Sequence, residues 1–332
     1  MRVTVKRAVT TLVAAMLLIL ITVLVVMTIR PIPLPFLSNY IKDQLDNRFH
    51  AYYVEFDDAQ TRWRPIKGTL EVHLNSTRAL DYGDNVLASI PKVLAEVRTK
   101  SIFNEQLELQ NLEFQNPRIS FIRTTGGALK FDIGSSDDGS SGRVLETILI
   151  YMVTAPTTLT VTNELLTNLR IVNFDLTLSD ETTGSLLHAP NANITLMPNN
   201  EGIGCAYDFK IFARGENLHI SGDCLYKTAS EEFNLLVNLD EVRPALLTEI
   251  SPQFSYLTPL EVRLSGEVRL ELDKLLTVKK AEFDLTSGNG SLEVTEYFGK
   301  NLDINAIHIA GKTLNGFSHI ELDNVIVQLD EA

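Results

Sequence analysis

Residues 264–272 read Leu-Ser-Gly-Glu-Val-Arg-Leu-Glu-Leu, and from Val268 onward apolar side chains alternate strictly with charged ones. Successive side chains of a β-strand point to opposite faces of a sheet, so this pattern predicts a strand with one sheltered face and one wet face. Gly266 follows a run of the same parity that begins at Leu260. We therefore expect a bend or a β-bulge at Gly266 rather than a break in the sheet.

The same period of two recurs through most of the chain. Alternating runs cover 70–75, 172–179, 207–213, 218–224, 233–239 and 281–286. In the second run, Val172, Phe174 and Leu176 are predicted to share the apolar face. Parity flips near 305–307 and 323–325, which β-bulges would explain. With about fifteen candidate strands and three short helical pieces, we expect a mostly β fold built from antiparallel strands.

The composition is that of a folded, acidic chain. Of 332 residues, 45% are hydrophobic, and 42 acidic against 29 basic side chains give a formal net charge of −13. This apolar content supports a sizeable core and argues against a disulfide-dense mini-protein, a collagen-like repeat or a disordered chain. An acidic chain without a basic stripe repels phosphates, so nucleic acid is not an expected partner.

The start of the chain predicts a membrane anchor. Residues 8–29 are uncharged, and a helix of this length extends roughly 33 Å, enough to cross the hydrocarbon core. Three cations lie within residues 1–7, so the positive-inside rule places these residues in the cytoplasm and everything after Arg30 on the far side. A cleaved signal peptide is the alternative, but 27–31 is not a small-residue cleavage site and the apolar run is long for one.

Beyond the anchor, the sequence predicts two β segments joined by a linker. Residues 30–133 form the first segment, which opens with a proline-containing exit and a short amphipathic helix near 38–45. Residues 134–142 are rich in Gly and Ser and predict a flexible linker. Residues 143–332 continue the β pattern after another short helix, which would serve either as a connector or as a mobile flap over an apolar groove.

The two cysteines fit an oxidising compartment. Cys205 and Cys224 lie on the apolar side of two alternating runs that a hairpin turn would connect. With Arg214-Gly215 as the turn the cysteines lie directly opposite each other, whereas with Gly215-Glu216 they are diagonal and less well placed for bonding. A disulfide and a pair of buried free thiols both remain open.

The sequence contains no recognisable catalytic or metal-binding signature. It lacks the His-Glu-x-x-His zinc motif, the Gly-x-Ser-x-Gly nucleophile elbow and the Gly-x-x-x-x-Gly-Lys phosphate loop. Its six histidines are scattered singly, which is typical of surface or strand-edge positions. We therefore expect no enzymatic activity, no metal and no cofactor.

The apolar faces of the predicted strands are the candidate ligand-binding surface. A lipid tail that leaves a bilayer needs apolar shelter, worth about 0.8 kcal/mol for each CH₂ group. An acidic chain does not hold anionic headgroups by charge, so lipid would bind through apolar surface. The candidate lining residues are Phe174, Leu176, Phe209, Ile211, Ile220, Leu235, Val237, Val268, Leu270 and Phe283.

A series of features follows the anchor in a fixed order. They are the proline exit at 31–35, the short helix at 40–45, a Trp-bearing strand at 61–63, and strands at 68–72, 87–91, 107–112 and 117–123. In this order the chain resembles the N-terminus of the AsmA-like proteins, particularly their YhdP branch. Residues 257–260 and 264–266 also resemble that branch. The shared features are patterns of strand and turn rather than catalytic fingerprints.

This resemblance implies a long, twisted antiparallel β-sheet curled into an apolar-lined groove, anchored in the inner membrane of diderm bacteria and projecting into the periplasm. The family is similar to the chorein-type bridge-like lipid transfer proteins, which implies phospholipid movement toward the outer membrane and a role in envelope integrity. Membrane lipids and other envelope proteins are the implied partners, and no catalytic residues carry over. Family members are usually far longer. Fifteen strands at about 4.8 Å give this chain a groove of about 70 Å, which is short for bridging two membranes alone. A chain that ends in a predicted strand at 328–330 is typical of a truncated protein or a fragment.

A membrane-anchored scaffold or assembly factor is the competing interpretation. The same strands would then close into a filled β-sandwich without a lipid channel. Geometry separates the two, because an open apolar lumen favours lipid transfer and a dry, packed interior favours the scaffold.

Overall fold

The computed structural model describes residues 2–33, 53–100, 109–126, 129–134, 166–181, 184–213, 216–246, 248, 255, 257–273, 278–294, 301–314 and 319–330. Within these ranges the chain forms one long helix, one short 3-10 helix and nineteen strands of a single sheet. The short helices predicted near 38–45 and after 143, and all but the first residue of the predicted linker, lie outside the described residues.

The elements follow one another from the helix to the last strand. They are α1 (Arg2–Ile29), β1 (Ile32–Pro33), β2 (Tyr53–Glu55), β3 (Asp58–Arg64), β4 (Thr69–Leu80), β5 (Val86–Arg98), β6 (Leu109–Gln115), β7 (Arg118–Arg123), β8 (Leu129–Ile133), β9 (Asn168–Asp180), β10 (Ser185–Asn199), β11 (Gly202–Ala213), β12 (Glu216–Lys227), β13 (Glu232–Val242), η1 (Pro244–Leu246), β14 (Leu260–Glu261), β15 (Leu264–Leu272), β16 (Val278–Ser287), β17 (Gly290–Leu292), β18 (Leu302–Leu314) and β19 (His319–Leu329).

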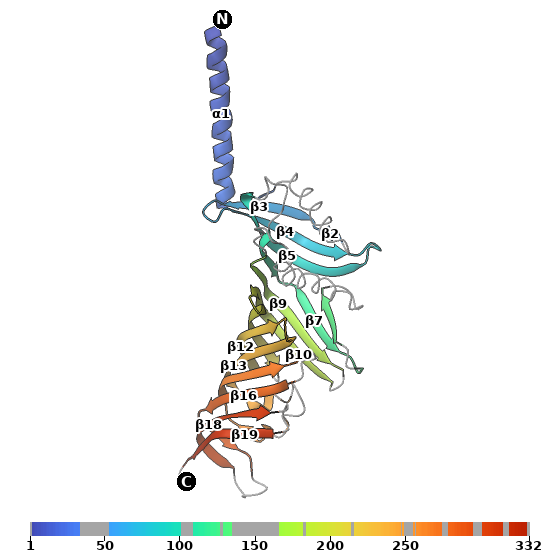
Figure 1. Cartoon of the computed structure of the whole chain (residues 1–332), viewed down its shortest axis with the longest axis vertical. Helices are drawn as coiled ribbons and strands as arrows, with labels where there is room; N and C mark the ends of the chain where they lie inside the picture. The colour runs from blue at the N-terminus through green and yellow to red at the C-terminus, as the bar shows by residue number, and fades with distance from the viewer. Residues whose placement is uncertain are drawn as a thin grey trace.

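Helix α1 leads directly into the first strand of the sheet. Its segment Leu12–Ile29 is long and apolar enough to cross a membrane. Pro31 ends the helix, because the residue before a proline, here Arg30, is driven out of the helical conformation. The guanidinium Nε of Arg62 on β3 donates a hydrogen bond to the Thr28 carbonyl at 3.2 Å. The base of α1 is therefore attached to the end of the sheet, from which it projects (Figure 1).

The sheet is a single open layer in which the main strands follow one another away from α1. The pairing order is β1, β3, β4, β5, β6, β9, β10, β11, β12, β13, β15, β16, β18 and β19. Every pairing is antiparallel except those of β9 with β6 and β7. The predicted mostly β fold, with its long sheet, is confirmed, and the C-terminal strands lie at the opposite end from α1 (Figure 1).

Bulges keep the apolar side chains on one face. The register of β18 against β19 shifts between Ile304 and Ala306 and again between Ala310 and Gly311, which confirms both predicted parity flips. Strand β15 runs unbroken through Gly266, and the irregularity lies on its partner β13. The prediction that Val172 lies on the apolar face was wrong. A register shift near Asn173, whose φ is +52°, turns Ile171 inward instead.

Candidate functional site

Side chains of one face line up in continuous rows across the sheet. We call this the apolar face. The first row joins fourteen strands through Ile32, Thr61, Val72, Ala95, Leu112, Leu169, Leu196, Cys205, Cys224, Leu235, Leu270, Ala281, Thr313 and Ile320. At roughly 4.8 Å between strands, this row extends about 60 Å from the base of α1. The hydroxyls of its two threonines are hydrogen-bonded to neighbours in the same row. Thr61 donates to the Ile32 carbonyl at 3.4 Å, and Thr313 accepts from the Ala281 amide at 3.2 Å.

A second row runs beside the first. It consists of Ala59, Leu74, Val93, Phe114, Ile171, Ile194, Tyr207, Gly222, Val237, Val268, Phe283, Gly311 and Leu322. Together the two rows contain Leu235, Val237, Val268, Leu270 and Phe283, five of the predicted lining residues. The structure therefore brings together side chains that the sequence could only place strand by strand.

Burial divides the apolar face into two parts. Phe174, Leu176 and Ile211 are at most 5% exposed and belong to the main hydrophobic core, which extends from β2 to β13 and η1. The other predicted lining residues, on strands β11 to β16, remain partly exposed: Phe209, Ile220, Leu235, Val237, Val268, Leu270 and Phe283. The half of the face near α1 is thus packed, whereas the distal half presents apolar surface.

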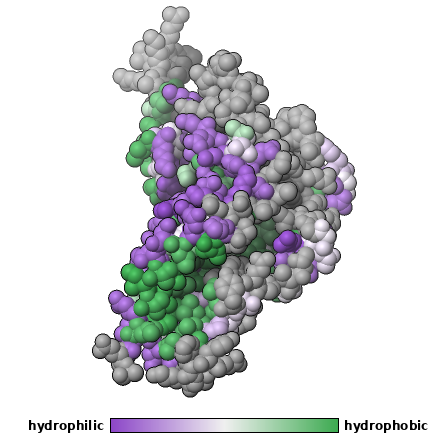
Figure 2. Space-filling view, turned by 60° about the horizontal axis from the view of Figure 1, so that its bottom comes forward, coloured by the Kyte–Doolittle hydropathy of each residue, from purple (hydrophilic) through white to green (hydrophobic). Residues whose placement is uncertain are grey.

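The distal end of the apolar face is the most exposed part of it. On β19, Ile320, Leu322 and Val325 are 51–57% exposed, and Val327 and Leu329 follow the same alternation. Figure 2, with the C-terminal end of the molecule turned forward, shows a broad hydrophobic patch with hydrophilic residues at its margins. Single exposed apolar residues are ordinary, but a contiguous patch of this kind marks an interaction surface.

Two glycines in the second row make room for aromatic rings. A Cβ atom on Gly222 would lie 2.9 Å from the Tyr207 hydroxyl and 1.8 Å from the Leu236 carbonyl oxygen. Through this gap the Tyr207 hydroxyl donates a hydrogen bond of 2.8 Å to that carbonyl. Burial raises the pKa of Tyr207 to about 12, so the phenol stays neutral as a donor. Gly311 and Phe283 repeat the arrangement on β18 and β16.

A disulfide bond is the one covalent cross-link in the described chain. Cys205 and Cys224 are directly opposed on β11 and β12, with their Cα atoms 4.8 Å apart, and they are bonded. Ala213 pairs with Glu216, which is the register of the first predicted turn alternative. Of the two alternatives, a disulfide and a pair of free thiols, the structure therefore shows the disulfide. It lies in the first row of the apolar face.

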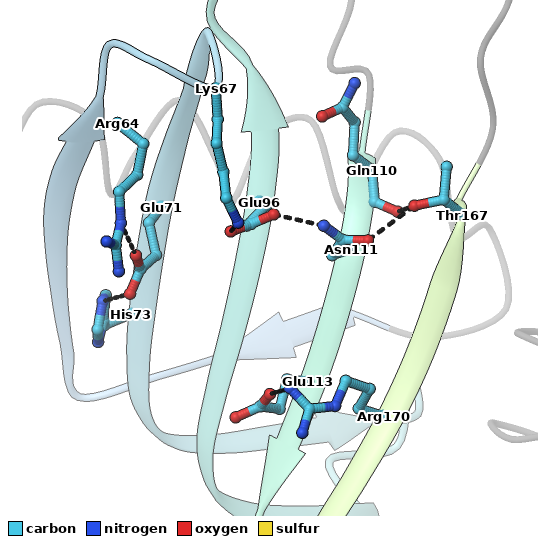
Figure 3. Close-up of polar contacts among 10 residues, drawn as sticks. All are labelled: Arg64, Lys67, Glu71, His73, Glu96, Gln110, Asn111, Glu113, Thr167 and Arg170. Atoms are coloured by element: carbon cyan, nitrogen blue, oxygen red, sulfur yellow. Dashed lines mark hydrogen bonds and ion pairs between the residues drawn. The ribbon is translucent and has the colours of Figure 1, made fainter. Parts of the chain in front are cut away.

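The opposite, outer face is polar, and its side chains pair across strands (Figure 3). Glu71 is buried and accepts from Arg64 Nε at 2.7 Å and from His73 Nε2 at 2.7 Å. Burial raises the pKa of Glu71, but the Arg64 hydrogen bond and the His73 charge outweigh it and hold that pKa below its usual value. Burial also lowers the pKa of His73, against the opposing charge of Glu71.

A second chain of polar contacts crosses the same face toward β9. Lys67 Nζ contacts Glu96 at 3.4 Å, and Asn111 donates to the same carboxylate. Thr167 in turn donates to the Asn111 side-chain oxygen at 2.7 Å (Figure 3). These contacts link β5, β6 and the start of β9, so they hold neighbouring strands together.

The described residues contain no candidate metal site. They contain no group of three or more His, Cys, Asp or Glu side chains arranged to hold a metal. A hollow of about 330 Å³ lies on the outer face over β12 to β16, where Leu225 and Leu236 are surrounded by charged residues. Two of those charges, Arg269 and Lys280, are paired with Glu267 and Glu282 at 2.6 Å. The distal apolar face is the stronger candidate site.

Comparisons with protein-family models, with curated proteins and with solved structures find no match to this chain.

Proposed function

We propose that the chain is a membrane-anchored protein that binds phospholipid acyl chains on the distal part of its apolar face. The observation that carries this proposal is the pair of continuous rows, which begin beside the helix that could cross a membrane and whose large apolar side chains remain partly exposed from β13 to β19. The resemblance to the AsmA-like family, YhdP branch, agrees with it. On that basis α1 lies in the inner membrane, the sheet lies in the periplasm, and lipid moves toward the outer membrane.

The energetics favour hydrocarbon as the ligand. Ten sheltered methylene groups of an acyl chain gain roughly 8 kcal/mol relative to water, which offsets much of the cost of leaving a bilayer. The partly exposed aromatic and aliphatic side chains of the face supply that shelter, while the polar outer face remains in water. The packed half near α1 bears on transport, because lipid that moves along both rows would have to displace the buried β9 side chains Leu169 and Ile171.

Neighbouring residues on β13 provide a matched test of this proposal. Leu235 lies on the apolar face and Leu236 on the outer face, and both are partly exposed. Native mass spectrometry of the full chain, released from detergent, is expected to show bound phospholipid. Leu235→Arg is expected to remove that lipid and Leu236→Arg to retain it, because the two variants carry the same charge on opposite faces.

Photocrosslinking gives a second readout that does not depend on a charge in the sheet. A benzophenone side chain at Val268 on the apolar face should crosslink to lipid, and one at the adjacent Arg269 on the outer face should not. If neither bound lipid nor a face-specific crosslink is found, the lipid-binding proposal fails.

The scaffold interpretation has one observation in its favour, which is the packed interior of the half near α1. A scaffold would use the exposed strand β19 and its patch to contact other envelope proteins. It predicts that Leu235→Arg leaves the function of the protein in cells unchanged, whereas substitutions on β19 abolish it.

A further inference from the structure

The turn between β3 and β4 carries an apolar residue in an unusual position. Ile66 in the turn Pro65-Ile66-Lys67-Gly68 is fully exposed. The turn is tight, because the Lys67 amide donates to the Arg64 carbonyl at 3.1 Å and the Gly68 amide to the Pro65 carbonyl at 3.2 Å. The φ of Gly68 is +66°, which glycine adopts without strain. The backbone thus holds the Ile66 side chain out in front of the sheet.

This turn lies beside the base of α1. Arg62, four residues before Ile66, is bonded to the Thr28 carbonyl in the last turn of the helix. Four residues of extended chain span roughly 13 Å. Strand β3 crosses the base of α1 rather than continuing its axis, so the turn stays at the level where the helix ends (Figure 1). For a helix that crosses a bilayer, that level is the membrane–water interface.

Cations gather at this end of the sheet. Arg64 and Lys67 flank Ile66, and their side chains remain 40% and 62% exposed although they contact Glu71 and Glu96. The end of β5 adds Lys100, which is exposed. That end lies alongside the turn, because the Thr99 amide donates to the Gly68 carbonyl at 3.0 Å. A basic rim around one exposed apolar side chain stands out in a chain whose net charge is −13.

We propose that the Pro65–Gly68 turn is a second membrane contact, which inserts Ile66 into the interface of the bilayer that α1 crosses. Arg64, Lys67 and Lys100 then lie at the depth of anionic lipid phosphates, where cations flanking an apolar side chain are favourable. The inference rests on the proposed anchoring by α1. One helix leaves the sheet free to turn about the helix axis, whereas a second contact fixes the first strands against the membrane surface.

Site-specific fluorescence tests this contact in the full chain. Both native cysteines are in the disulfide, so Ile66→Cys provides a single site for the polarity-sensitive dye NBD. The matched control is Tyr82→Cys, in the exposed turn at the other end of β4, about 40 Å along the strand. Both proteins are reconstituted into vesicles of phosphatidylcholine with phosphatidylglycerol, with and without lipids that carry a nitroxide near the headgroup.

The dye at position 66 is expected to be blue-shifted and quenched about twofold or more by the nitroxide lipids, and the dye at position 82 is not. Lys67→Gln combined with Lys100→Gln is expected to weaken the quenching at position 66 in anionic vesicles. Equal, weak quenching at positions 66 and 82 in protein that is stably reconstituted overturns the inference. Bound lipid and face-specific crosslinks are measured separately, so this result leaves the proposed lipid binding standing. Failure to reconstitute at all removes the anchoring itself.

Discussion

Replacing Gly222 with alanine should destabilise the sheet at a defined point of the apolar face. The new Cβ would lie 1.8 Å from the Leu236 carbonyl oxygen on β13, and this obstacle is backbone, not a flexible side chain. An ordinary contact needs more than 3 Å, so β12 and β13 must separate by more than an ångström. The Tyr207 hydroxyl, which lies 2.9 Å from the new Cβ, then loses its bond to the same carbonyl.

The magnitude follows from two costs. Overpacking of this kind costs about 1–3 kcal/mol, and the part-buried hydrogen bond contributes about 1 kcal/mol more. We therefore expect Gly222→Ala to lower the free energy of unfolding by about 2–4 kcal/mol. The assay is urea unfolding of the full chain in detergent, followed by far-ultraviolet circular dichroism.

Gly204→Ala on the neighbouring strand β11 is the matched control. A Cβ atom there meets nothing closer than 3.7 Å, so the same substitution should change stability by less than about 0.5 kcal/mol. Tyr207→Phe, which removes only the hydroxyl, should account for about 1 kcal/mol of the Gly222→Ala effect. If Gly222→Ala and Gly204→Ala unfold at the same urea concentration, the close packing described for Gly222 is refuted.

Three further predictions concern the core, the disulfide and the outer-face cluster. Leu169→Ala should cost about 2–5 kcal/mol in urea unfolding, because Leu169 is fully buried in the first row. Reduction of the Cys205–Cys224 bond, which encloses a separation of 19 residues, should cost about 3 kcal/mol and lower the melting temperature. Acid should destabilise the fold, because the pKa values of His73 and Glu71 are both lowered. The unfolded chain then binds more protons, so stability falls as pH drops below 6.5 and again below 4.5. His73→Gln should flatten the first of these steps in a pH series of thermal melts.

Controls for these predictions lie on β19. Leu329→Ala removes an exposed leucine and should leave stability within about 0.5 kcal/mol of wild type. If Leu169→Ala lowers stability no more than Leu329→Ala does, the burial argument is contradicted. His319→Gln, which changes an exposed histidine at the sheet edge, is the control for His73→Gln. If the melting temperature of His73→Gln depends on pH in the same way as that of wild type, the Glu71 cluster does not cause the first loss of stability at low pH. If the reduced and oxidised proteins have the same melting temperature, the disulfide adds no stability.

The division of the apolar face bears on how lipid would be handled. Near α1 the face is packed by its own side chains, and this core includes Ile211 and Leu218 on β11 and β12, whereas the large apolar side chains of the two rows from β13 onward are partly exposed. Under the proposed function, the described conformation would bind a hydrocarbon ligand on its distal strands. Lipid exchange with the bilayer would need the packed half to open, or delivery to the distal half from another protein.

Sequence alone determined the elements whose signal is local. Strict alternation at 264–272 predicted a strand because side chains alternate in any extended chain, and the uncharged run at 8–29 predicted a long apolar helix. Opposed parity on either side of one turn was enough to make the Cys205–Cys224 disulfide one of two alternatives. These inferences needed only the geometry of a single strand, helix or hairpin.

Tertiary structure decided what depends on neighbours distant in sequence. The sequence does not show that β9 lies parallel to β6, or that the first row joins Leu112 to Leu169, because pairing partners are chosen by contacts across the whole sheet. The inward turn of Ile171 depends on a bulge against β10, and the close packing at Gly222 depends on a ring from β11. The same holds for burial: alternation predicts which side chains share a face, but how far the sheet curls determines which of them are packed.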